Sequence, residues 1–133
     1  MAIPKLEQAW NTRTPEAVAD LFTPDGVRHQ LALPEGRFAG REAIIGVVGA
    51  IMHAAPDCEL AVSEAHESGG TTTVEWTFSG TLTNDFPGLP ASGQRFALPG
   101  VSVCTMDGAS IREERIYWDT ATLMAAAGVL PTG

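Results

Sequence analysis

Two acidic side chains near the carboxyl-terminal end of the chain are alternative candidates for proton transfer. Asp119 follows a strand-like run, residues 111–118, and precedes a short apolar helix pattern, residues 120–127. Isoleucine, tyrosine and tryptophan favour the first segment as a strand, whereas alanine, leucine and methionine favour the second as a helix. Asp119 therefore lies at a strand-to-helix turn, where its carboxylate either caps the helix or faces a cavity.

Strand alternation places the second acid, Glu114, on the opposite face from Asp119. Successive side chains of a strand point to opposite faces, so Asp119 shares a face with Tyr117, and Glu114 shares the other with Arg112 and Trp118. If the Trp118 face borders a cavity, Glu114 becomes the rival of Asp119 as acid or base. If it is the outer face, Glu114 is an interface or solvent charge.

His29 is the third candidate. It lies in the alternating segment 27–31, where Val27 and Leu31 share its face. This pattern predicts that the His29 face is buried, where a neutral imidazole could donate to or accept from a substrate oxygen. A core histidine satisfied by backbone groups fits the same pattern, so both readings stay open.

The elements that must position these groups follow a simple order. Predicted helices cover residues 3–10, 14–22, 43–55 and 120–127, and predicted strands cover residues 27–31, 57–67, 71–84, 95–106 and 109–118. Turn residues at 23–26, and glycine-containing turns at 68–70 and 107–108, separate them. Two or three helices followed by long antiparallel hairpins predict an α+β domain whose curved sheet wraps around its helices and encloses a cavity.

Large apolar side chains are the candidates for the wall of that cavity. Trp76 and Phe78 share the apolar face of the 71–84 strand, and Trp118 lies near the end of the last strand. A tryptophan on an amphipathic helix, such as Trp10, is as compatible with the core as with a pocket lid. The expected pocket residues are Trp10, Ile44, Val48, Trp76, Phe78 and Trp118.

Composition limits the classes of function. A chain of 133 residues with 44% hydrophobic content predicts one domain, residues 1–133. The formal charge of -8, from 16 acidic and 8 basic residues, argues against nucleic acid and anionic membranes as partners. The amino-terminal residues do not have a basic segment followed by an apolar run, so we expect a soluble, cytoplasmic protein.

Metal and cofactor motifs are lacking in the sequence. It contains no P-loop, dinucleotide fingerprint or HExxH motif. Cys58 and Cys104 stand far apart in apolar surroundings and are predicted to be buried thiols rather than a disulfide or metal ligands. We therefore expect neither a metal nor an organic cofactor.

Several short motifs occur in a characteristic order along the chain. They are Trp10, DGVRH at 25–29, GREAI at 40–44, PD at 56–57, GTLT at 80–83, PGLP at 87–90, GQ at 93–94 and YWD at 117–119. In this order they resemble the SnoaL-like group of the nuclear transport factor 2-like (NTF2-like) superfamily over nearly the whole chain. The chain departs from that group at Leu82, where many relatives carry a histidine, and at residues 126–128, where many have Gln-Leu-Gly.

The resemblance implies a cone-shaped α+β barrel, with amino-terminal helices packed in a curved, mostly antiparallel sheet around an apolar pocket. It also implies a homodimer formed through the outer face of the sheet. Members include polyketide cyclases, steroid isomerases and limonene-type epoxide hydrolases, which use side-chain acids and bases without a metal or organic cofactor. Other members have no known catalysis, so fold alone does not assign a reaction.

The leading functional prediction is a cofactor-independent cyclase or isomerase that acts on a hydrophobic carbonyl compound. In cyclases of this group an aspartate near the end of the last strand is the general acid/base, and Asp119 is the nearest match, with His29 polarising the carbonyl. Epoxide opening, the first alternative, needs two carboxylates bridged by an arginine, and Ile116 occupies the position of one of them. A non-catalytic protein that binds a hydrophobic small molecule is the second alternative.

Overall fold

A curved six-stranded sheet with the strand order β2-β1-β6-β5-β4-β3 forms the frame of this computed structural model, which describes residues 3–31, 35–86 and 89–129. The strands are β1 Phe22–Gln30, β2 Arg37–Ala39, β3 Glu59–Ser68, β4 Thr71–Thr81, β5 Arg95–Asp107 and β6 Ser110–Trp118. Strands β1 and β6 pair in parallel, and every other neighbouring pair in this sheet is antiparallel.

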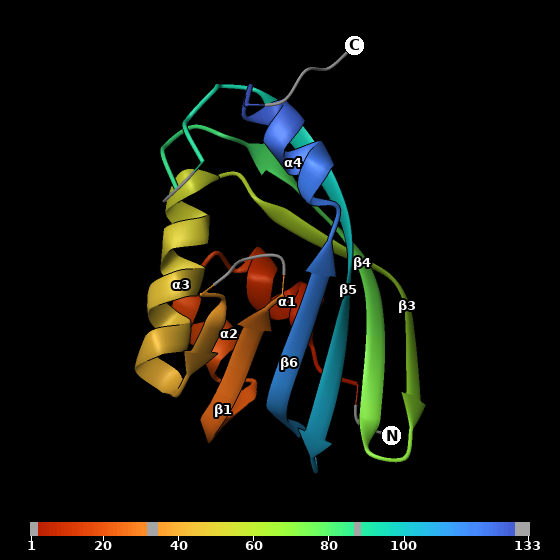
Figure 1. Ribbon diagram of the computed structural model, residues 1–133. Helices are drawn as coiled ribbons and strands as arrows, with labels where there is room; N and C mark the ends of the chain where they lie inside the picture. Colours follow the sequence, from red (N-terminus) through yellow and green to blue (C-terminus); the bar gives the residue numbers. More distant parts are fainter. Residues whose placement is uncertain (1–2, 32–34, 87–88, 130–133) are drawn as a thin grey trace.

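Within the described residues four helices complete the fold: α1 Leu6–Asn11, α2 Pro15–Ala19, α3 Arg41–Ala54 and α4 Thr120–Ala126. Figure 1 shows α1, α2 and α3 on one side of the curved sheet, with α4 crossing one of its ends. The core lies between the helices and the sheet, where Val18, Ile44, Val74 and Ile111 are completely buried. This arrangement confirms the α+β class with helices packed inside a curved, mostly antiparallel sheet.

No helix in the described ranges combines the length and the apolar composition that crossing a bilayer requires.

The first strand departs from the sequence prediction at both ends. Residues 23–26, predicted as a turn, belong to β1, which begins at Phe22 and changes its register with β6 between Phe22 and Val27. The helix predicted to reach residue 22 ends at Ala19. The short strand β2 was not predicted, because three residues cannot display a period-two pattern. The strand was predicted to reach Leu31 and ends one residue earlier, at Gln30.

A bulge in β6 interrupts the alternation of inward and outward side chains at Arg112. Thr105 pairs with Glu113 and Met106 with Ile111, which leaves Arg112 as the extra residue between two pairings. Such an insertion breaks the alternation of faces. Ile111 and Glu114 are therefore both buried, whereas Arg112 is exposed. The strict alternation that would place Arg112 on the Glu114 face is wrong for this reason.

Gly100 makes room for a tryptophan at the centre of the sheet. It lies in β5 opposite Trp76 of β4 and opposite Trp118 of β6. A Cβ atom at position 100 would overlap the six-membered ring of Trp76. The absence of a side chain at Gly100 therefore allows the Trp76 ring to lie flat across the neighbouring strand.

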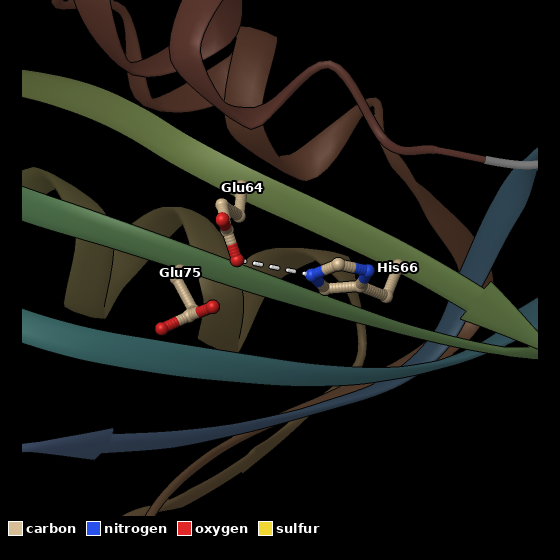
Figure 2. A group of neighbouring side chains, drawn as sticks. All are labelled: Glu64, His66 and Glu75. Carbon is tan, nitrogen blue, oxygen red and sulfur yellow. Dashed lines mark hydrogen bonds and ion pairs between the residues drawn. The ribbon is translucent and has the colours of Figure 1, made fainter.

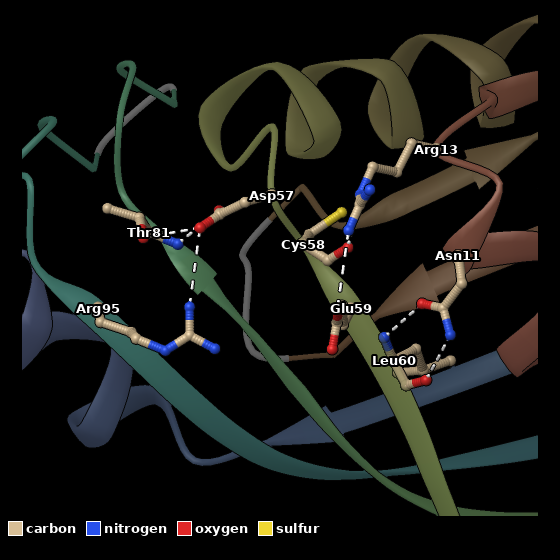
Figure 3. A network of polar contacts seen from close by, with 8 residues as sticks. All are labelled: Asn11, Arg13, Asp57, Cys58, Glu59, Leu60, Thr81 and Arg95. Carbon is tan, nitrogen blue, oxygen red and sulfur yellow. Dashed lines mark hydrogen bonds and ion pairs between the residues drawn. The ribbon is translucent and has the colours of Figure 1, made fainter.

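A set of polar contacts fastens the beginning of β3 to its neighbours (Figure 3). Asn11 of α1 donates to the carbonyl of Leu60 and accepts from its N–H, at 3.0 and 2.8 Å. Just before β3, Asp57 accepts from the N–H and the hydroxyl of Thr81, both at 2.8 Å, with the Arg95 guanidinium 3.7 Å away. The hydrogen bonds from Thr81, helped by the Arg95 charge and opposed by burial, hold the pKa of Asp57 below its ordinary value.

We expect Gly100→Ala to destabilise the fold by about 1–3 kcal/mol, because the added methyl group forces the Trp76 ring off its position. Gly46→Ala is the matched control, since a Cβ there meets nothing within 4 Å and alanine favours the interior of α3. Urea unfolding of both variants checks the prediction. An unchanged stability in Gly100→Ala would contradict the packing described for Trp76.

Asp57→Asn should lower stability at neutral pH by about 0.5–1.5 kcal/mol, near the lower limit because the carboxylate is half exposed. Since the folded pKa of Asp57 is depressed, its contribution is present above the ordinary value of 3.8 and is lost as pH falls through the folded pKa. The difference from the parent protein should therefore shrink in acid. Urea unfolding over a pH series measures it, with Asp107→Asn, which removes a single exposed ion pair, as the control.

Candidate active site

A cavity of about 360 Å³ lies between the helices and the inner face of the sheet. Side chains from α1, α3, α4 and five of the strands line it, together with Leu82, Phe86 and Leu89 of the β4–β5 connection. Most of the lining is apolar. A cavity of this size and character is typical of sites for small hydrophobic ligands.

Four of the six expected pocket residues line this cavity: Trp10, Trp76, Phe78 and Trp118. Ile44 and Val48 do not, and are instead completely buried in the core. In α3, only Ile51 and Ala54 of the last turn line the cavity. The buried side chains of the earlier turns, such as Val47, belong to the hydrophobic core. The chain has three tryptophans, and all three line the cavity.

The polar floor of the cavity is a connected group of buried side chains, which we call the Glu114 cluster: Arg28, Gln30, Trp76, Ser102 and Glu114. Arg28 Nη1 donates to Glu114 Oε1 at 3.1 Å, and Arg28 Nε donates to Gln30 Oε1 at 3.0 Å. Ser102 Oγ donates to Glu114 Oε2 at 2.6 Å and accepts from Trp76 Nε1 at 2.9 Å. Glu114 is only 2% exposed and Arg28 5%.

Register and face explain why these residues meet. Arg28 pairs directly with Glu114 across the parallel β1–β6 ladder. Ser102 pairs with Ile116, two residues along the same face of β6 from Glu114. Neighbouring strands therefore bring three polar side chains to one spot without any contribution from a loop, which gives the cluster a rigid support.

The charge on Arg28 has two compensating partners. Burial lowers the pKa of Arg28, while the adjacent Glu114 carboxylate opposes that shift. The guanidinium carbon also lies 5.3 Å from the centre of the Trp10 ring, a cation–π distance. An ion pair this deeply buried is costly to break, about 3–5 kcal/mol when one partner is removed, because the other charge is left without compensation.

The prediction that the His29 face of β1 is buried is wrong. Arg28 and Gln30 point inward, while Val27 and His29 are half-buried on the other face and Leu31 is 37% exposed. His29 is not among the residues that line the cavity. The apolar-inward rule fails here because Glu114 and Gln30 satisfy the Arg28 guanidinium. The polar pair Arg28 and Gln30, spaced two apart in an otherwise apolar segment, was the available signal.

Asp119 takes the helix-capping position. Its Oδ1 accepts from the Thr122 N–H at 3.2 Å and its Oδ2 from the Thr122 hydroxyl at 2.7 Å. The side chain is exposed and does not line the cavity. These hydrogen bonds, led by the Thr122 hydroxyl, lower the pKa of Asp119. The geometry thus favours Glu114 over Asp119 as the acid or base of the cavity.

Trp118, one of the residues that line the cavity, has an indole N–H that makes no hydrogen bond within the described part of the chain. Its Nε1 is buried and is without a hydrogen-bond partner among the described residues. An unpaired buried N–H costs about 1–3 kcal/mol. A ligand oxygen that reached this indole would recover that cost.

Among the described residues that line the cavity, Arg28 and Glu114 are the two ionisable groups. Epoxide opening by the mechanism considered above needs a second carboxylate, and this part of the chain does not supply one there. Cys58 and Cys104 are free and buried, as predicted from the sequence. Burial, more than the nearby Glu114 charge, raises the pKa of the Cys104 thiol.

A separate group of potential metal ligands lies outside the cavity, on the β3–β4 hairpin. The side chains of Glu64, His66 and Glu75 come together there (Figure 2), with ligand atoms within 4.8 Å of one another. All three are exposed, and His66 Nε2 lies 3.1 Å from Glu64 Oε2. This group is therefore not part of the apolar site.

Solved structures of other proteins share this architecture. IdmH of Streptomyces antibioticus, a proposed polyketide cyclase, is 25% identical with a TM-score of 0.73, covering 93% of this chain and 94% of that chain. A proposed SnoaL-like polyketide cyclase from Jannaschia sp. CCS1 is 22% identical with a TM-score of 0.80, covering 96% and 89%. A protein of ketosteroid isomerase-like fold from Catenulispora acidiphila, in complex with trimethylamine, is 23% identical with a TM-score of 0.77, covering 97% and 96%.

No curated protein sequence matches the chain. The family model described as SnoaL-like polyketide cyclase matches residues 1–127. Because this match spans nearly the whole chain and the solved structures share its sheet and helices, the chain belongs to the SnoaL-like polyketide cyclase family and has the ketosteroid isomerase-like, or NTF2-like, fold.

Proposed function

We propose that this protein is a cofactor-independent acid/base enzyme of the cyclase or isomerase type, which acts on a hydrophobic carbonyl compound in the cavity. The observation that carries the proposal is the position of Glu114, a buried carboxylate facing a mostly apolar cavity beside one positive charge. Membership of a polyketide cyclase family supports the same class of reaction. Glu114 takes the catalytic role that the family resemblance implied for Asp119.

Binding relies on shape and on few polar contacts. The aromatic rings of Trp10, Trp76 and Phe78 present apolar surface to a flat or polycyclic ligand and exclude water. Trp118, which also lines the cavity, has an unpaired N–H that could donate to a ligand oxygen. Because Arg28 and Glu114 neutralise each other, the cavity favours an uncharged ligand.

The chemical step is the transfer of one proton. The Glu114 carboxylate removes a proton from the carbon next to the carbonyl, and the electron pair of that C–H bond becomes the new double bond of an enolate. The Arg28 guanidinium offsets the negative charge that develops on the substrate. In an isomerisation Glu114 returns the proton to another carbon. In a cyclisation the enolate carbon attacks a second carbonyl of the same molecule, and the resulting alkoxide takes the proton.

The elementary step can be measured without the natural substrate, because 2-tetralone, a hydrophobic bicyclic ketone, exchanges its α-protons for deuterium in D₂O. We expect the protein to accelerate this exchange and Glu114→Gln to slow it by about 10²–10⁴-fold, the usual contribution of a positioned base. Asp119→Asn, the matched acid-to-amide control, should leave the rate within about twofold of the parent, because Asp119 does not line the cavity. Proton NMR follows the loss of the α-proton signals.

Binding is measured in parallel by tryptophan fluorescence, which reports on the cavity because all three tryptophans line it. If 2-tetralone binds but exchanges no faster than in buffer, the protein is a binder of hydrophobic molecules rather than an enzyme of this type. If Asp119→Asn abolishes exchange and Glu114→Gln does not, Asp119 is the base and the assignment of Glu114 is wrong.

A further inference from the structure

Two of the groups around Glu114, the Trp76 indole and the Arg28 guanidinium, have a hydrogen-bond direction that chemistry dictates. An indole N–H and a guanidinium can donate hydrogen bonds but not accept them. Trp76 Nε1 therefore donates to Ser102 Oγ, at 2.9 Å, and uses a lone pair of that oxygen. Ser102 Oγ lies 2.6 Å from Glu114 Oε2 and donates its single proton to that oxygen when the carboxyl group is ionised. Arg28 Nη1 donates to Oε1 at 3.1 Å.

We propose that Trp76 and Ser102 are positioning residues that form a one-way hydrogen-bond relay and hold Glu114 as an ionised carboxylate in the resting protein. Each carboxylate oxygen accepts one hydrogen bond and can accept a second. The relay thus orients the carboxyl group and leaves room on it for a proton from the substrate. Together with the proposed function, on which this step rests, it assigns Glu114 as the base that starts the reaction rather than as an acid.

The cost of the relay argues that it is more than a packing detail. Ser102 and Trp76 are 1% and 8% exposed and lie among apolar core residues, where valine and phenylalanine would fill similar space without polar atoms. Gly100, two residues before Ser102, makes room for the indole that reaches the hydroxyl. Trp76 on β4, and Gly100 and Ser102 on β5, therefore all support one chain of hydrogen bonds that ends at the Glu114 carboxylate.

Few other groups can set the charge of Glu114. Arg28 faces it from β1, and Cys104, its pairing partner on β5, has a thiol whose pKa is raised by burial. Helices α1 and α3 contribute uncharged lining, such as Leu6 and Ile51. Since Arg28 is retained in every variant below, a change in the titration of the carboxyl group reports on the relay.

Infrared difference spectra of the parent against Glu114→Gln isolate the carboxyl signal of Glu114 and distinguish carboxylate from protonated acid. We expect a carboxylate at neutral pH. In Ser102→Ala the midpoint of protonation should move up by about one pH unit, because the ionised form loses one charge-assisted hydrogen bond. Trp76→Phe should move it by less, since the hydroxyl remains but is no longer oriented, and Ser102→Thr should restore the parent value.

Ser79→Ala, on strand β4 outside the Glu114 cluster, is the control for a serine-to-alanine change, and circular dichroism checks that each variant is folded. If Ser102→Ala does not fold, Trp76→Phe provides the test on its own. A protonated Glu114 at neutral pH in the parent protein overturns the inference. So does a protonation midpoint that is unchanged in the folded relay variants.

The exchange of 2-tetralone separates this inference from the proposed function. If the infrared midpoint shifts as expected and no exchange is catalysed, the relay stands and the proposed activity fails. If exchange depends on Glu114 but the midpoint stays constant in the variants, the activity stands and the relay fails. If both hold, the pH profile of exchange should shift upward in Ser102→Ala in step with the infrared midpoint.

Discussion

The ion pair between Arg28 and Glu114 is the constraint on which the rest of the site depends. It joins β1 to β6, the one parallel pairing described in the sheet, and both side chains are almost completely buried. A buried charge is tolerated only when it is paired and hydrogen-bonded. The ion pair therefore settles which face of β1 points inward, and it forces Gln30 and Ser102 to occupy interior positions as supporting partners.

Around this pair the fold combines two opposed environments. The apolar side chains of α1, α3 and the sheet remove water from the cavity, which strengthens every electrostatic interaction inside it. The polar cluster supplies direction, because its members lie on paired strands rather than on loops. Trp76 belongs to both environments: its ring forms cavity wall beside Gly100, and its N–H supports the polar floor.

Much of the architecture could be predicted from patterns in the chain. Glycine-containing turns and capping residues indicated where the hairpins and helices lie. The alternation in β4 correctly placed Trp76 and Phe78 on the cavity side. The prediction that Trp118 and Glu114 share a face of the last strand was also correct. The bulge at Arg112 was not visible in the alternation. Face assignment failed in β1, since a local pattern of apolar residues cannot reveal that an arginine has a partner 86 residues away.

The sequence by itself determined the class of fold, the order of its elements and the set of side chains able to do chemistry, because periodicity and turn residues act over short distances. The tertiary structure alone decided which of these side chains meet. Asp119 caps a helix through Thr122, two residues of α3 expected in the pocket are core, and Glu114 gains Arg28 and Ser102. Strand register across the sheet, a long-range property, sets those contacts. It therefore also determines that Glu114, rather than Asp119 five residues later, is the acidic side chain in the cavity.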